Sequence, residues 1–282
     1  MNIEQILRNP QLRIGRNEEL IASETYFKGR INFYVSENNE IAANSWAILY
    51  SIFNVQNNYI KIFELFELGE YYLAWCQLEG IEIAIKSILK HHKFIDDEYK
   101  ILFIKEYVLK LQSLFPYKLF GSSELVKKEI RCSICDSIIS LRNRCIHKKG
   151  ELYMGEMCSF IVTKSEMVGM SLVNEPFNKY SVIGVTKKDD DTYKYPQIDF
   201  LMSIIDHPFT EWRTKDSKVL ESHEKFNSGR NEECPCRSRK KYKKCCLKKD
   251  GIEFDHTEFI LKYPTIKSQQ NNTFSKNPTR LG

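Results

Sequence analysis

The stretch that most constrains this chain is Gly229-Arg-Asn-Glu-Glu-Cys-Pro-Cys-Arg-Ser-Arg-Lys-Lys-Tyr-Lys-Lys-Cys-Cys246. It holds two close pairs of thiols separated by eight residues, at Cys234, Cys236, Cys245 and Cys246. Each pair can supply two corners of a tetrahedral coordination sphere. Soft thiolates favour zinc or an iron–sulfur centre over hard cations. Because the stretch has almost no apolar side chains for a core, metal binding would supply its folding energy.

Disulfides and unrelated buried thiols are the alternative interpretations of these cysteines. Nine cysteines in 282 residues are not a disulfide-dense composition. The N-terminal residues 1–8 lack the apolar core of a secretory signal, and no run of about 20 apolar residues is long enough to span a membrane. We therefore expect a cytoplasmic protein without a membrane partner, whose clustered thiols hold structural Zn²⁺.

The same residues resemble the SEC-C motif, a small zinc module first known from the C-terminal tail of the SecA translocation ATPase. The Gly-Arg-Asn opening, the C-x-C-x8-C-C spacing and the Lys-Lys-Tyr-Lys-Lys segment all match that motif. Arg237 and Arg239 stand where the motif usually has glycines, so the turn after Cys236 must use residues that resist positive φ. The resemblance implies a structural metal but names no function, because the module is an appendage of many proteins.

Positive charge is concentrated in this part of the chain. The formal net charge of the whole chain is +5, yet ten Lys or Arg and three acidic residues between Lys225 and Asp250 give this segment +7. Four thiolates around one zinc ion carry a combined charge of −2, which would lower the net positive charge of this segment by 2. A basic surface suits RNA or DNA, although a solvated tail would have the same composition. The residues expected to contact RNA are Arg237, Arg239, Lys240, Lys241, Lys243 and Lys244.

The first half of the chain has the spacing of helices. Apolar residues recur at steps of three and four from Trp75 to Leu89, and again from Ile130 to Cys145. Pro116 is the only proline between residues 11 and 174, so few helix breaks are expected. The pattern predicts a mainly α protein, in which a helical bundle is followed by a small C-terminal zinc module.

Five segments are expected along the chain. They are an N-terminal extension at 1–38 with a short strand at 31–35, a helical domain at 39–160 and a connecting segment at 161–224. The zinc module at 225–250 and a polar tail at 251–282 follow. The connecting segment is expected to hold a β-hairpin at 180–195 with an acidic turn, and a short helix at 200–206.

The residues Arg142-Asn-Arg-Cys-Ile-His147 have side chains suited to RNA cleavage without a metal. His147 can exchange a proton with a ribose hydroxyl near neutral pH, and Arg142 can stabilise charge on the phosphate. Asn143 can position either group. A plain helix C-terminus, where cations interact well with the dipole, is the alternative. Cys132, Cys135 and Cys145 are interpreted as core residues, because their spacing is helical and no fourth ligand is evident.

This pattern resembles the HEPN superfamily, whose motif is R-x4–6-H with a polar residue directly after the arginine. Glu82, Lys86 and Leu89 are similar to a further E-x3-K-x2-L pattern of that family, and the likeness covers residues 40–150. It implies a homodimeric endoribonuclease in which the RNA 2′-hydroxyl attacks the phosphate, leaving a 2′,3′-cyclic phosphate. Many such proteins are toxins or act in abortive defence against phage.

We therefore expect a metal-independent endoribonuclease whose basic module docks RNA, a ribosome or a regulatory protein. The alternative is a non-catalytic adaptor, in which the zinc module recruits nucleic acid or protein, as a targeting adaptor would.

Overall fold

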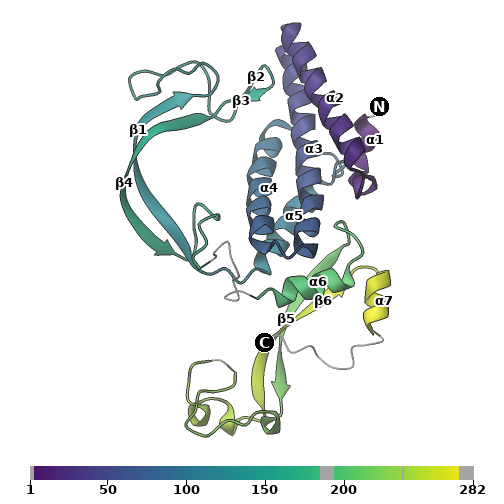
Figure 1. The fold of residues 1–282 in the computed structure, drawn as a ribbon, viewed down its shortest axis with the longest axis vertical. Coiled ribbons are helices and arrows are strands. Elements are labelled where there is room, and N and C mark those ends of the chain that lie inside the picture. The colour runs from purple at the N-terminus through teal and green to yellow at the C-terminus, as the bar shows by residue number, and fades with distance from the viewer. Residues whose placement is uncertain (1–2, 185–193, 237, 273–282) are drawn as a thin grey trace. The chain divides into compact units, whose positions relative to one another are not determined.

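The computed structural model describes residues 3–184, 194–236 and 238–272. The described residues divide into two compact units, the first comprising residues 3–203 and the second residues 204–272. Figure 1 shows the helices at the N-terminal end of the first unit and a long two-stranded ribbon in each unit. In the described residues, no helix is both long and apolar enough to cross a membrane.

The first unit begins with helices joined by short loops. Their order is α1 (Ile3–Arg8), η1 (Pro10–Arg13), α2 (Asn17–Ser36), α3 (Glu40–Glu67), α4 (Tyr71–His91) and α5 (Ile101–Ser113). The Asn39 side chain caps α3 by accepting a hydrogen bond from the Ala42 N–H (3.1 Å), and Gly69, with φ +73°, follows the end of that helix. The strand expected at 31–35 is therefore wrong, because these residues lie within α2.

The core of the first unit lies between α3, α4 and α5. Their inward faces bury large side chains at helical spacing, including Phe53, Tyr59, Leu78, Ile85 and Ile104. The helices expected from residue 39 onward are thus present as far as Ser113. Glu82 and Lys86, four residues apart on α4, form an ion pair of 2.8 Å.

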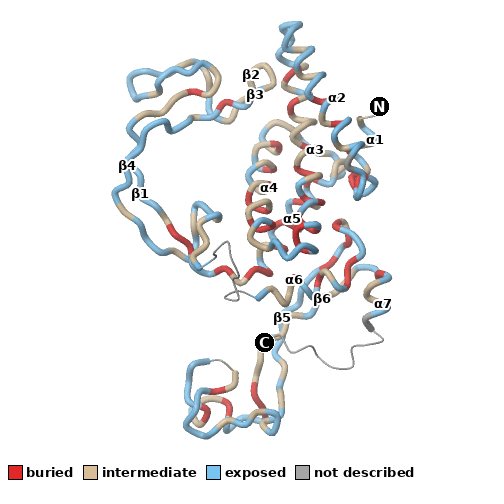
Figure 2. The backbone as a smooth tube through the Cα atoms, viewed as in Figure 1, coloured by how far each residue is buried: buried red, intermediate tan, exposed pale blue. Residues whose placement is uncertain are grey.

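Beyond α5 the chain turns to β-structure, so the expectation of a mainly α fold is wrong. The protein is mixed α/β, and its described residues form three two-stranded sheets. Strand β1 (Phe120–Cys132) pairs antiparallel with β4 (Phe160–Val173), and we call this pair the first ribbon. Most of its residues are exposed, as Figure 2 shows. A ribbon with solvent on both faces has no alternation of apolar and polar residues, so its sequence lacks the usual signal of a strand.

The first ribbon carries a tip insert, residues 133–159, which includes the small hairpin of β2 (Leu152–Tyr153) and β3 (Glu156–Met157). This hairpin docks on α3, where Asn44 donates to the Leu152 carbonyl (3.2 Å) and accepts from the Gly155 N–H (2.7 Å). His91 of α4 bonds the Gly150 carbonyl (2.8 Å). The ribbon is therefore attached to the helices through its tip.

The base of the first ribbon is bound to the segment at residues 181–182. The Gly121 N–H donates to the Ser181 carbonyl (2.8 Å), and Val182 pairs with Phe120. The hairpin expected at 180–195 is only partly described, because residues 185–193, where its acidic turn was expected, lie outside the described residues. The short helix expected near 200–206 is present as α6 (Pro196–Ile204).

The second unit consists largely of a second ribbon. Strand β5 (Trp212–Glu221) pairs antiparallel with β6 (Ile252–Leu261), and α7 (Ile266–Asn272) follows. The Asp206 carboxylate accepts from the Ile266 N–H (2.8 Å) and so holds the start of α7. Residues 222–251 form a small module at the tip of this ribbon, which we call the C-terminal module. It contains the short 3-10 turns η2 (His223–Lys225), η3 (Tyr242–Lys244) and η4 (Cys246–Lys248).

Candidate metal centres

All nine cysteines are free, and seven of them lie in two clusters of metal-ligating side chains. Each cluster sits at the tip of one ribbon. Within each cluster, every ligand atom lies within 4.8 Å of every other. Four ligands about 2.3 Å from one central ion lie about 3.8 Å apart at tetrahedral angles. Both clusters therefore have the size of a site for a single metal ion.

The four-cysteine cluster joins the thiols that the sequence singles out, in the C-terminal module. The Cys236 and Cys245 sulfurs are 3.5 Å apart, and the Cys245 and Cys246 sulfurs are 3.8 Å apart. Backbone hydrogen bonds close the loop between the two pairs, because the Cys234 N–H donates to the Lys240 carbonyl (2.8 Å). The residues that were expected to form one site are thus brought together.

A few apolar and aromatic side chains support this cluster. Cys234, Tyr242, Cys246 and Ile252 are buried against one another, and Phe226 and Phe254 pack on them. His223 is a supporting residue that the sequence did not single out. Its Nδ1 bonds the Tyr242 hydroxyl, and its Nε2 bonds the Lys249 carbonyl (2.8 Å). His223 lies outside the cysteine spacing, so the sequence gives no indication that it belongs to the module.

The surroundings shift the pKa values of Cys236 and Cys246 in opposite directions. Burial acts to raise the pKa of Cys236, but hydrogen bonds from Ser238 and from neighbouring cysteines lower it to about 6. Burial raises the pKa of Cys246 to about 12. A metal ion favours thiolate in both, since thiolate is the form that binds metal.

The turn after Cys236 contains the strained residue that the sequence indicates. Arg239 has φ +58°, in the left-handed region that a glycine adopts without strain, whereas Arg237 lies outside the described residues. We expect Arg239→Gly to stabilise the module by up to about 1 kcal/mol, which is about fivefold in metal affinity measured by chelator competition. Arg230→Gly is the matched control, since it removes the same charge where φ is not positive. An equal gain in both variants would contradict the argument from strain.

The basic residues of the module are available to a partner. Arg239, Lys240, Lys241 and Lys244 are exposed, and Lys243 is half-buried. None of them forms an ion pair with an acidic residue within the described part of the chain. Lys249, by contrast, pairs with Glu253 (2.9 Å). The module therefore carries unneutralised positive charge on its surface.

The residues expected to catalyse RNA cleavage lie on the irregular tip insert. No helix contains them, Arg142 lies in a bend, and the Asn143 N–H donates to Ser140 Oγ (3.0 Å). No hydrogen bond joins either residue to His147 among the described residues. The helix expected from Ile130 to Cys145 is wrong, because that stretch runs from β1 into the irregular tip insert.

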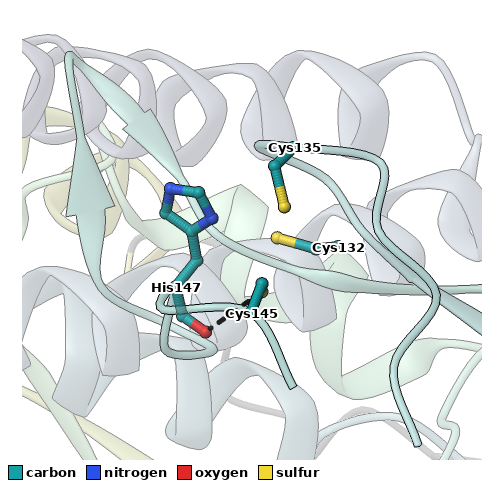
Figure 3. A group of neighbouring side chains, drawn as sticks. All are labelled: Cys132, Cys135, Cys145 and His147. Atoms are coloured by element: carbon teal, nitrogen blue, oxygen red, sulfur yellow. Dashed lines mark hydrogen bonds between the residues drawn. The ribbon is translucent and has the colours of Figure 1, made fainter. Parts of the chain in front are cut away.

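His147 instead belongs to the second cluster, together with Cys132, Cys135 and Cys145 (Figure 3). The interpretation of these three cysteines as core residues holds for Cys132, which is buried, but not for Cys135, which is exposed. In the pattern C-x2-C-x9-C-x-H, His147 is the candidate fourth ligand. This pattern is hidden in the sequence because the same residues also recur at helical steps, and because His147 fits the arginine–histidine pattern.

A tight turn brings the first two thiols of this cluster together. The Asp136 N–H donates to the Cys132 carbonyl (2.9 Å), and Asp136 adopts φ +56°. Its carboxylate pairs with Arg131 (2.8 Å), across the bridge between Arg131 and Ile138. Burial acts to raise the pKa of Cys132, but the backbone N–H groups of Cys135 and Ile134 and nearby thiols lower it to about 7.

Comparison with known proteins identifies one part of the chain. Residues 230–248 match the family model of the SEC-C motif, which confirms the resemblance inferred from the cysteine spacing. No curated protein and no solved structure matches the chain. The resemblance of residues 40–150 to the HEPN superfamily receives no support from these comparisons. The chain therefore carries a SEC-C motif at residues 230–248, with its four cysteines gathered into one cluster.

Proposed function

We propose that this protein is a nucleic-acid-binding adaptor, in which the C-terminal module folds around a structural zinc ion and presents a basic surface to RNA. The observation that carries this proposal is the group of exposed lysine and arginine side chains on the module that have no acidic partner within the described residues.

Zinc is the metal that these ligands suit best. Four thiolates form a closed tetrahedral site and leave no position for water, so the ion would stabilise the fold rather than act on a substrate. Sulfurs 3.5 and 3.8 Å apart fit a single ion. Lys240, Lys241 and Lys244 lie in the loop between the two cysteine pairs, so metal binding would order the residues that face RNA.

The proposed contacts are with phosphates. Lysine side chains recognise charge rather than base identity, and contacts to the RNA backbone position a protein without specifying sequence. We therefore expect salt-dependent binding with little sequence preference. The cytoplasmic setting, the homodimer and the ribosomal or regulatory partner stay predictions.

The test is RNA binding by the triple variant Lys240→Gln, Lys241→Gln, Lys244→Gln, measured by fluorescence anisotropy with a single-stranded RNA. The slope of log K against log salt is negative, and each lost phosphate contact makes it shallower by about 0.7. Three lost contacts therefore make it shallower by about 2. The same loss weakens binding about 100-fold near 0.1 M salt.

The matched control replaces Lys61, Lys105 and Lys118 with glutamine. These are exposed lysines of the first unit, and the substitution changes the net charge of the chain equally. An equal loss in the control would mean that total charge, rather than the module, governs binding. Salt-insensitive capture of a protein, without RNA binding, would favour the targeting adaptor.

Endoribonuclease activity is the second candidate. The observation in its favour is that Arg142, Asn143 and His147 lie close in sequence on one irregular insert, next to the cations of Lys148 and Lys149. The test incubates total RNA with the metal-loaded protein and with its Arg142→Ala and His147→Cys variants. Cleavage that both substitutions abolish would support the nuclease, together with its predicted dimer and its role as a toxin or in phage defence. Cleavage that survives both would remove the proposed catalytic site.

A further inference from the structure

We propose that Cys132, Cys135, Cys145 and His147 form a second zinc site, separate from the SEC-C motif, at the tip of the first ribbon. Their ligand atoms all lie within 4.8 Å of one another, as in the four-cysteine cluster. Three thiolates and one imidazole are an established ligand set for tetrahedral structural zinc.

The imidazole supplies the most specific observation. His147 Nδ1 is buried and has no hydrogen-bond partner within the described part of the chain. Figure 3 shows the ring turned so that one nitrogen faces the side chain of Cys132. A buried nitrogen without a partner destabilises the fold, whereas a metal ion at this position would satisfy it. Metal binding at Nδ1 assigns the proton to Nε2, the other ring nitrogen.

The tip insert also lacks a core of its own. Between residues 132 and 159 only Cys132 and Cys158 are buried, and their sulfurs lie 3.8 Å apart. A segment of this length cannot hold a defined conformation by apolar packing when it buries so little. Coordination by four side chains would replace that missing core, as it does in small metal-dependent folds.

The site would also hold the insert against the helices. The His147 ring packs edge-on against Tyr153 (4.6 Å between centroids), and the Tyr153 hydroxyl accepts from the Lys148 N–H (2.8 Å). Tyr153 lies on the β2–β3 hairpin that docks on Asn44 of α3. A metal ion bound by His147 would therefore fix both the loop and the hairpin that attaches the ribbon to the bundle.

The first experiment measures zinc in the purified full chain by mass spectrometry of the metal. We expect two equivalents in the wild type, one in Cys135→Ser, one in Cys236→Ser and none in the double variant. Cys76→Ser is the control, because Cys76 lies on α4 and belongs to neither cluster, and it should retain two equivalents. One equivalent in the wild type, or two in Cys135→Ser, would overturn the proposal.

A second measurement begins with the unmodified protein, so its main result does not depend on whether a variant folds. X-ray absorption at the zinc edge of the unmodified protein should fit seven sulfur ligands and one nitrogen per two ions, as the two clusters contain. His147→Cys should retain two equivalents and shift the fit to sulfur alone. A fit to four sulfurs per ion in the wild type would contradict the site. RNA binding by the C-terminal module should be unchanged in Cys135→Ser, so this proposal and the proposed function fail independently.

Discussion

Cys234→Ser is expected to abolish metal binding by the four-cysteine cluster and to unfold the C-terminal module. Cys234 is buried with Tyr242, Cys246 and Ile252, so the substitution removes a ligand and places a hydroxyl in a very small core. Structural zinc supplies about 10–16 kcal/mol to small modules of this kind at neutral pH, far more than a core of a few side chains provides. The loss should therefore be complete rather than partial.

Limited proteolysis of the full chain provides the measurement. In the metal-loaded wild type the exposed Lys and Arg of the module should resist trypsin, whereas Cys234→Ser and chelator-treated wild type should be cleaved there rapidly. Cys76→Ser should behave like the wild type. A module that stays protected without metal would show that packing alone holds it.

Gly155→Val is expected to destabilise the first unit by about 2–4 kcal/mol. Gly155 has φ +81°, and a Cβ at this position would lie 2.7 Å from Ile31 Cγ2 and 3.6 Å from the Ala43 carbonyl oxygen. The new side chain would thus be strained in its backbone and would overlap α2. It would also disturb the hydrogen bond between the Gly155 N–H and Asn44, which attaches the β2–β3 hairpin to α3.

Thermal unfolding of the full chain, followed by far-UV circular dichroism, should show a transition lowered by several degrees. Gly29→Ala is the matched control. Gly29 lies within α2, and a Cβ there meets nothing within 4 Å, so alanine should stabilise the helix by about 1 kcal/mol. Equal destabilisation by the two substitutions would contradict docking of the hairpin on the helices.

The sequence predicts a metal site best where the ligands lie close together along the chain. Cys234 and Cys236 are two residues apart, and Cys245 and Cys246 are adjacent, so each pair meets in any fold that keeps the loop short. The left-handed conformation of Arg239 is also foreseeable, because Arg239 stands where the SEC-C motif usually has a glycine. The helices over residues 39–113 have long apolar stripes at steps of three and four, a spacing that is typical of a helix and not of a strand.

The segment around Cys132 shows why the rest could not be predicted. Ile130, Ile134 and Ile138 recur at steps of four, as on a helix, but they lie on a strand, in a tight turn and in a bridge. A ribbon exposed on both faces places polar and apolar residues without a period of two, so nothing in the sequence contradicts a helix. The strand forms because β1 pairs with β4, and that partner lies far along the chain: Cys132 pairs with Phe160.

By itself, then, the sequence determined the C-terminal module, its basic character and the helices that precede the first ribbon, because spacing and periodicity act over a few residues. Only the tertiary structure decided that His147 lies beside three thiols. That choice depends on the turn at Asp136 and on strand pairing across the first ribbon, which together bring Cys132, Cys135, Cys145 and His147 to one point.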